Sequence, residues 1–242
     1  MPKHKILVID DEKPTLDMFL LFLKAYGYEV LLAENGAQGL EMFAAESPAI
    51  VFTDVKMPGM DGFEVLDRIK SQAPETEVIV ITGHGDMDLA VEALNHEATD
   101  FINKPIHRSA LDAALNRAEE RIKLSKTDAT ITGAVQENDI RIIEIKGNVD
   151  AGSEKGLMDA CTNMDTAEKP KLLLRFHDNA SINGAGIGVL IQLLSESGKR
   201  QQKVAITGIS ENFKKIFDMV GITRLAGIFP DDRSAKAYLD AD

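Results

Sequence analysis

The sequence predicts an α/β protein of two successive domains, a doubly wound five-stranded parallel sheet followed by a mixed sheet with helices. Over residues 5–123, five apolar runs of strand length alternate with five segments whose apolar residues recur at helical spacing. The alternation lapses in a short polar stretch near residues 125–132, which we interpret as a linker. Two strand patterns then follow each other directly, around the turn 137–139, which indicates a hairpin and therefore a mixed sheet.

Each element of the first half has its own signal. We expect strands at 5–9, 29–32, 49–54, 77–81 and 100–102. Pro14 suits the first turn of the first helix, which Gly27 closes. Asn35 is a suitable N-cap for the second helix, and Pro74 ends the third. The fourth and fifth helices carry apolar stripes over 89–94 and 110–118, and the fifth extends to about Lys123.

In the second half we expect strands at 130–136, 140–145, 171–176 and 203–206, with a last short strand at 228–229. A turn at 147–150 leads into a helix over 153–164, and a polar loop over 177–183 precedes a helix over 184–201. Helices over 212–220 and 234–239 complete the chain.

Composition narrows the class of protein. The chain has 242 residues, of which 44% are hydrophobic, and no apolar run approaches the roughly 18 residues of a membrane span. The single Cys161 excludes an intramolecular disulfide and suits a reducing cytoplasm, which we expect as the location. Residues 1–124 hold 12 lysines and arginines against 22 acidic residues, a net charge of −10 that argues against nucleic-acid binding.

Polar residues gather where the predicted strands of the first domain end: Asp10, Asp11, Asp54, Thr82 and Lys104. The carboxyl ends of parallel strands form one rim, where such sheets place their chemistry. Several carboxylates together call for a cation, and Mg²⁺ prefers hard oxygen ligands. A carboxylate beside Mg²⁺ can attack a phosphoryl group, whose charge a lysine and a hydroxyl then hold. The alternative makes Asp10 and Asp11 helix N-cap acids and Lys104 a solvated loop cation.

These motifs resemble the receiver domain of two-component response regulators. The matching residues are Asp10-Asp11, the run from Asp54 to Gly59 with Asp61-Gly62, Thr82, and Lys104-Pro105. The run Thr82 to Asp86 and the segment 100–105 are similar to receivers of the nitrogen-regulator type. The resemblance implies a flavodoxin-like fold, over about half of the chain, and a sensor histidine kinase as a partner.

The resemblance also implies roles for single residues. Asp54 is the expected phosphorylation site, and Asp11, Asp54 and the backbone carbonyl of Lys56 are the expected Mg²⁺ ligands. Asp10 would act mainly through the water shell of the metal, and Lys104 would pair with the acidic cluster or the phosphoryl group.

Further roles concern the switch between states. The resemblance implies a cis peptide between Lys104 and Pro105, which is uncommon in folded chains. Thr82 would swing to the phosphoryl group and Phe101 would rotate inward, although Phe101 can equally be an ordinary core residue. Lys56 and His84 stand where such receivers tune the lifetime of the aspartyl phosphate, and His84 can also be a plain loop residue.

The turn from Asn183 to Gly188 is rich in glycine. A glycine-rich turn before a helix can cradle phosphate, but this spacing matches neither a Walker loop nor a dinucleotide motif. The second half instead resembles a STAS domain, the fold of bacterial anti-sigma-factor antagonists. The matching segments are the opening hairpin with 147–150, the strand 172–176, the run 181–190 and the segment 204–208.

Two departures from that family concern its control. Its helix entry usually reads Asp-Ser-Ser-Gly, and the second serine is phosphorylated. This sequence has Asn183, Gly184, Ala185 and Gly186 there, so the hydroxyl is missing, and Arg175 stands where an aspartate is usual. We nevertheless expect this turn to form the partner surface of the domain.

Together these features predict a receiver at 1–124, a linker at 125–132 and a STAS domain at 133–242. We expect phosphorylation of Asp54 to control protein–protein binding by the second domain, with an anti-sigma factor or a switch-type serine kinase as the partner. The alternative is a phosphorylation-controlled scaffold or oligomerising subunit, including a homodimer. We expect no enzymatic activity beyond the phosphorylation chemistry of the receiver. We also expect no DNA-binding function, because the second half shows strands where a helix-turn-helix would have helices.

Overall fold

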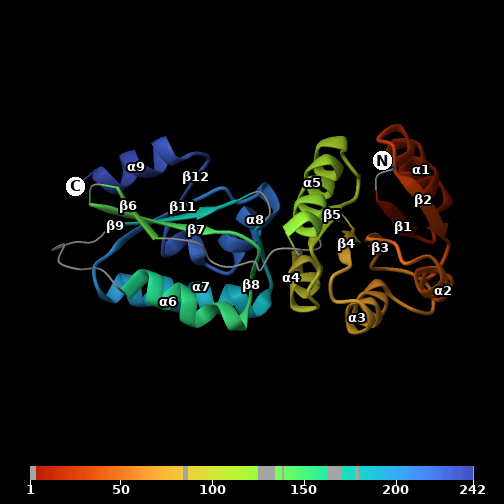
Figure 1. The fold of residues 1–242 in the computed structure, drawn as a ribbon, viewed down its shortest axis with the longest axis horizontal. Helices are drawn as coiled ribbons and strands as arrows, with labels where there is room; N and C mark the ends of the chain where they lie inside the picture. The colour runs from red at the N-terminus through yellow and green to blue at the C-terminus, as the bar shows by residue number, and fades with distance from the viewer. Residues whose placement is uncertain are drawn as a thin grey trace. The chain divides into compact units, whose positions relative to one another are not determined.

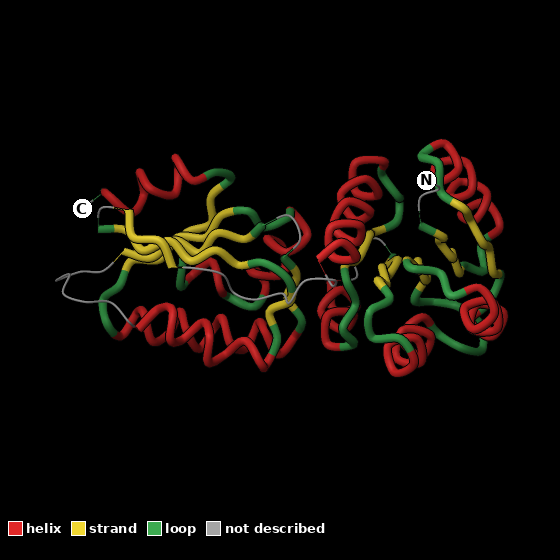
Figure 2. Tube along the Cα trace, viewed as in Figure 1, coloured by secondary structure: helices red, strands yellow, loops and turns green. Residues whose placement is uncertain are grey.

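The computed structural model describes residues 4–83, 87–124, 134–137, 139–162, 171–177 and 180–241. The chain divides into two compact units, residues 1–125 and residues 126–242. In each unit a sheet is flanked by helices (Figures 1 and 2).

The first unit is a doubly wound parallel α/β domain, as predicted. Its five strands are β1 (Lys5–Ile9), β2 (Glu29–Ala33), β3 (Ile50–Asp54), β4 (Glu77–Thr82) and β5 (Asp100–Asn103). They lie in the order β2-β1-β3-β4-β5, and every neighbouring pair is parallel. The helices between and after them are α1 (Lys13–Ala25), α2 (Gly36–Glu46), α3 (Gly62–Gln72), α4 (Met87–Asn95) and α5 (Arg108–Leu124).

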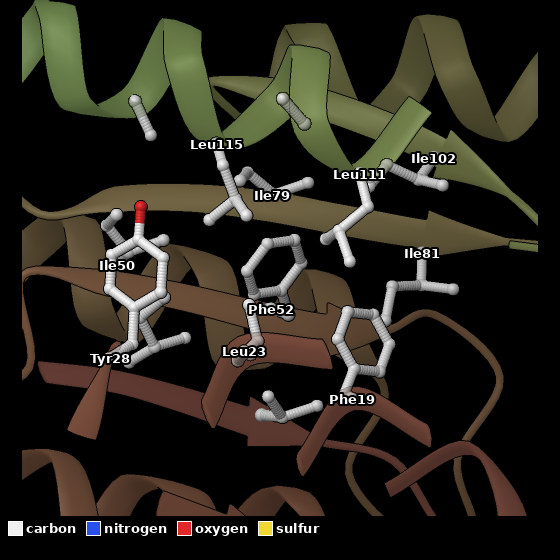
Figure 3. Close-up of a cluster of buried hydrophobic side chains, with 14 of the residues drawn as sticks. Phe19, Leu23, Tyr28, Ile50, Phe52, Ile79, Ile81, Ile102, Leu111 and Leu115 are labelled. Carbon is white, nitrogen blue, oxygen red and sulfur yellow. The ribbon is translucent and has the colours of Figure 1, made fainter. Parts of the chain in front are cut away.

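A hydrophobic cluster packs α1 and α5 against one face of this sheet (Figure 3). On α1, Leu16, Phe19 and Leu23 recur at the three- to four-residue spacing that places side chains on one face of a helix. Phe19 meets Phe52 of β3 with ring centroids 5.1 Å apart. Because successive strand residues point to opposite faces, Phe52 packs here while its buried neighbour Val51 points to the other face. The cluster thus joins β1, β3, β4 and β5 to the two helices.

The second unit contains the predicted mixed sheet. Its strands lie in the order β12-β11-β9-β7-β6, parallel except for the antiparallel hairpin of β6 and β7. They are β6 (Ala134–Glu137), β7 (Ile140–Ile145), β9 (Lys171–Phe176), β11 (Lys203–Thr207) and β12 (Gly227–Phe229). The helices are η1 (Ala151–Ser153), α6 (Glu154–Thr162), α7 (Gly184–Lys199), α8 (Glu211–Met219), η2 (Ile222–Arg224) and α9 (Asp232–Asp240). Figure 1 shows α9 on one face of this sheet and α6 and α7 on the other.

One feature of the second unit was not predicted. Two residues of the expected turn form β8 (Asn148–Val149), and two residues of the expected polar loop form β10 (Ser181–Ile182). These strands pair in parallel, and the backbone N–H of Ser181 and of Asn183 donates to the carbonyl of Gly147 (3.0 Å) and of Val149 (3.2 Å). A two-residue strand is too short to show alternation, so the sequence pattern could not reveal it.

Some predicted boundaries fall where the structure gives no description. The linker 125–132, the start of the expected strand at 130–136 and the end of the expected helix at 153–164 lie outside the described residues. Within the described part of the chain, no helix combines the length and the apolar character needed to cross a membrane.

Candidate functional site

The parallel strands of the first unit bring the predicted polar residues to one edge of the sheet. Asp54 is the last residue of β3 and Thr82 the last of β4, while Asp10 and Lys104 directly follow β1 and β5. Asp10 is fully buried and Asp54 is 5% exposed. Two acidic groups therefore lie at this edge with little access to water, where charges interact more strongly than in bulk solvent.

The ammonium group of Lys104 joins three carboxylates. Its Nζ lies 2.7 Å from Glu12 Oε2, 2.9 Å from Asp54 Oδ1 and 3.1 Å from Asp10 Oδ2. The contact with Asp10 is an ion pair by distance only, because Asp10 Oδ2 accepts no hydrogen bond from any residue that the structure describes. The other oxygen of Asp10 accepts a hydrogen bond from the backbone N–H of Glu12 at 2.8 Å.

The protonation of this cluster follows from burial and charge. Burial raises the pKa of Asp10, although the N–H of Glu12 and the charge of Lys104 oppose the change. Burial alone would lower the pKa of Lys104, but its hydrogen bonds to Glu12 and Asp54 and the charges of Asp54 and Asp10 outweigh burial and raise it. Lys104 is therefore held as a cation among these carboxylates.

The carboxylate of Asp54 is fixed by the loop that follows it. Its Oδ2 accepts a hydrogen bond from the backbone N–H of Lys56 at 2.8 Å. Gly62, the first residue of α3, packs so closely that a Cβ atom there would lie 2.1 Å from the carbonyl oxygen of Asp54. Asp61 caps α3 by accepting from the N–H of Glu64 at 2.9 Å. The residue type at position 62 is therefore dictated by the close approach of the helix to the strand end.

The expected switch residues lie on β4 and β5. The hydroxyl of Thr82 donates a hydrogen bond to Asn103 Oδ1 at 2.6 Å, and Phe101 is fully buried. The peptide bond between Lys104 and Pro105 is cis, as the resemblance implied. His84 lies outside the described residues.

The alternative interpretation of Asp10 and Asp11 as N-cap acids is wrong. The N-cap of α1 is Glu12, and no side-chain cap hydrogen bond forms there in the described chain. Asp10 instead faces Lys104, and Asp11 is exposed at the same edge. The alternative for Lys104 is also wrong, because its side chain is 25% exposed and paired with acidic groups.

The donor set suits Mg²⁺. Asp10 and Asp54 supply hard oxygen atoms, and Asp10 Oδ2 is buried without a hydrogen bond within the described residues. Among those residues, no group of three or more acidic, histidine or cysteine side chains is gathered closely enough to hold a metal. Mg²⁺ does not require such a group, because it keeps several waters and is usually bound through one or two carboxylates.

In the second unit, the candidate binding site lies at the start of α7. Asn183 is its N-cap and accepts from the N–H of Gly186 at 2.9 Å. A Cβ atom at Gly186 would lie 2.0 Å from the carbonyl oxygen of Val149 in β8. Ala185, which by the resemblance stands where the STAS family has a serine, is exposed on the first turn of α7. The structure therefore presents position 185 to solvent with a methyl group.

Arg175 forms ion pairs with two acidic side chains of the second unit. Its guanidinium donates to Glu144 of β7 at 2.8 Å and to Asp232 at the start of α9. Thr207 of β11 donates to the same aspartate at 3.0 Å. The arginine thus connects two strands and α9, where the family usually has an aspartate.

Sequence reasoning missed two residues of the first site. It gave no role to Glu12, whose carboxylate lies nearer to the Lys104 ammonium than those of Asp10 and Asp54, or to Asn103, the acceptor for Thr82. Both residues are next in sequence to predicted site residues at the strand ends. Their position in the sequence was therefore the signal that could have identified them.

Comparison with known proteins identifies both units. Residues 6–116 match the response regulator receiver domain and residues 133–235 match the STAS domain. The chain therefore combines a segment that matches the receiver domain of response regulators with a segment that matches the STAS domain.

Curated relatives resemble the first half. The transcriptional regulatory protein FixJ of Bradyrhizobium diazoefficiens is 38% identical over 116 residues, which cover 48% of this chain and 57% of FixJ. The transcriptional regulatory protein ZraR of Klebsiella oxytoca is 37% identical over 131 residues, 54% of this chain and 30% of ZraR. The chain thus spans less than two thirds of either relative. A solved receiver domain protein from Clostridium thermocellum is 40% identical, with a TM-score of 0.49, over 51% of this chain and 99% of that one.

Proposed function

We propose that Asp54 accepts a phosphoryl group from a sensor histidine kinase in the presence of Mg²⁺, and that this modification controls protein binding by the STAS domain. One observation carries the proposal. The Asp54 carboxylate lies at the strand edge with Oδ2 held by the N–H of Lys56 and Oδ1 2.9 Å from the ammonium of Lys104.

The chemistry follows from this geometry. An oxygen of Asp54 forms a bond to phosphorus while the bond between phosphorus and the kinase imidazole nitrogen breaks. The leaving nitrogen keeps the bonding electron pair and the other ring nitrogen carries a proton, which gives an aspartyl phosphate and a neutral histidine. Bound Mg²⁺ would neutralise charge on the phosphoryl oxygens, with Asp10, Asp11, Asp54 and the carbonyl of Lys56 as its ligands or water partners. Lys104 already contacts Asp54 and can hold a phosphoryl oxygen by charge and hydrogen bonding.

The proposed switch connects this site with β4 and β5. The hydroxyl of Thr82 would leave Asn103 and donate to a phosphoryl oxygen. Thr82 pairs with Asn103 of β5, and the buried Phe101 lies two residues before Asn103 on the same strand, so we propose that release of Asn103 is passed along β5 to Phe101. The helix and strand surface around β4, α4 and β5 is the part of the receiver that we expect to signal.

Control of the STAS domain would then come from the aspartate instead of a serine. Ala185 has no hydroxyl, so phosphorylation cannot occur at that exposed position. The entry of α7 keeps its cap and its close packing on β8, but Asn183 and Gly186 are buried there. Of the four residues predicted for the partner surface, Ala185 is exposed and Gly184 is half-buried, so the binding surface that we propose centres on Ala185. An anti-sigma factor or a switch-type serine kinase is the partner that we propose for it.

The acceptor is tested by incubation with acetyl phosphate and Mg²⁺, followed by phosphate-affinity electrophoresis. We expect the wild-type chain to be modified and D54A to remain unmodified. D61N is the matched control, because Asp61 lies in the same loop and asparagine is an equally good N-cap. Modification of D54A to the wild-type extent would refute the acceptor assignment.

The output is tested by a pull-down with and without beryllofluoride, a mimic of the aspartyl phosphate. A partner captured in one state only supports phosphorylation-controlled binding. The same partners in both states refute it, and light scattering then asks whether beryllofluoride changes the number of copies in the assembly. That outcome would favour the scaffold or oligomerisation function, which the missing hydroxyl at Ala185 also fits.

A further inference from the structure

Glu12 occupies a helix cap position without acting as a cap. It is the N-cap residue of α1, yet no side-chain cap hydrogen bond forms there in the described chain. Its carboxylate, 59% exposed, turns instead to Lys104, with Oε2 2.7 Å from Nζ. The hydroxyl of Thr15 donates to the same oxygen at 3.3 Å. The side chain is therefore oriented toward the lysine of the site.

Three acidic groups share one ammonium group in this arrangement. An ammonium has three N–H donors, and here it faces Glu12, Asp54 and Asp10. A phosphoryl group on Asp54 adds negative charge and three acceptor oxygens at the position that Lys104 must serve. Lys104 already donates to Glu12 and Asp54, and the phosphoryl oxygens add negative charge on the Asp54 side, so they draw the ammonium group away from Glu12 and the two groups compete for the same cation.

We propose that Glu12 is a positioning residue that holds Lys104 in the unphosphorylated state and competes with the phosphoryl group for it. The proposal rests on the proposed function of Asp54. The contact between Glu12 and Lys104 stabilises the resting state and is weakened in the phosphorylated state. By linkage, loss of the contact shifts the equilibrium toward the phosphorylated form.

The size of the effect follows from exposure. Glu12 is mostly exposed and Lys104 is 25% exposed, so water screens their attraction. Exposed ion pairs usually change an equilibrium by at most about five-fold. We expect the variant E12Q, which keeps the shape of the side chain and removes its charge, to bind beryllofluoride about two- to five-fold more tightly.

The experiment titrates beryllofluoride into the Mg²⁺-loaded full chain and follows backbone amide signals by NMR. The matched control is E34Q, because Glu34 is an exposed carboxylate in the loop after β2, at the same end of the sheet. Tighter binding by E12Q with unchanged binding by E34Q supports the proposal. Unchanged or weaker binding by E12Q overturns it, as does an equal gain in both variants, which would indicate a general charge effect.

A second measurement separates this proposal from that of Asp54. In metal-free protein at fixed pH, the ¹⁵Nζ signal of Lys104 reports its contact with Glu12. We expect this signal to move in E12Q and not in E34Q. An unmoved signal overturns the role of Glu12 whatever the acceptor does. A moved signal in a chain whose wild type fails to bind beryllofluoride refutes the acceptor assignment, and with it the competition.

Discussion

Gly186 provides a test of how the second unit positions its candidate binding surface. The variant G186A adds one methyl group at the entry of α7. That carbon would lie 2.0 Å from the carbonyl oxygen of Val149, 2.6 Å from its carbonyl carbon and 2.9 Å from Cγ1 of Ile182. Two of these three neighbours are backbone atoms of β8, which cannot rotate away as a side chain can. The helix or the strand must therefore move.

The magnitude follows from the overlap. Real Cβ atoms essentially never approach such neighbours within 3.0 Å, so the shift must exceed the 1.0 Å that separates 2.0 Å from 3.0 Å. Overpacking of a tight interior usually costs about 1–3 kcal/mol, and we expect the upper end because the contact is with backbone. Gly188 of the same helix is exposed, and beyond its chain neighbours and the adjacent backbone of α7, no described atom lies within 4 Å of its added Cβ. G188A should stabilise the helix by about 1 kcal/mol through backbone propensity.

The assay is urea unfolding of the full chain, followed by hydrogen exchange and mass spectrometry. Peptides from α7 and β8 report the second unit separately from the first. We expect G186A and G188A to shift the free energy of unfolding in opposite directions and to differ by about 4 kcal/mol. Equal stability of the two variants, or a stable G186A, would refute the close packing of α7 on β8.

Three further predictions concern titration, metal and charge. Burial raises the pKa of Cys161 to about 12 from 9.0, so the unfolded thiol ionises first as the pH rises. Between about pH 9 and 12 the second unit of the wild type should therefore lose up to about 4 kcal/mol of stability relative to C161A. The same pH dependence of stability for the wild type and C161A in urea titrations would contradict this. Mg²⁺ at about 100 times its dissociation constant should raise the free energy of unfolding of the first unit by about 2.7 kcal/mol in the same assay. We expect D10N to lose most of this gain in stability, and a full gain in D10N would contradict a role for Asp10. R175L should destabilise the second unit by about 1–3 kcal/mol, because Glu144 and Asp232 lose a shared partner, and unchanged unfolding would show that the bridge is dispensable.

The sequence predicted most of the fold because its signals are local. Strand and helix patterns of ordinary length gave the five βα units and the mixed sheet, and Asn35 caps α2 through the N–H of Gln38 as expected. The strands β8 and β10 were not predicted, because two residues are too few to show a periodic pattern. Their existence depends on pairing between positions about 33 residues apart, such as Asn148 and Ser181.

The residues of the candidate site could be predicted from their types and their positions at strand ends. The hydrogen bonds and ion pairs between them could be predicted less well. The topology of a parallel sheet brings Asp10, Asp54 and Lys104 to one edge whatever the loops do. The direction in which Glu12 points depends on the geometry of the first turn of α1, and the partner of Thr82 depends on the register of β4 and β5. These contacts depend on the tertiary structure, so they cannot be predicted from the pattern of residues along the sequence.

The exposed methyl group of Ala185 bears on how this chain can change over evolutionary time. The frame around it is made of backbone bonds, the Asn183 cap and the glycine contact with Val149, and none of these uses the side chain at position 185. Substitutions at that position are therefore close to neutral for folding and are constrained only by what binds there. A single substitution can therefore remove or restore a hydroxyl at this position without rebuilding the domain.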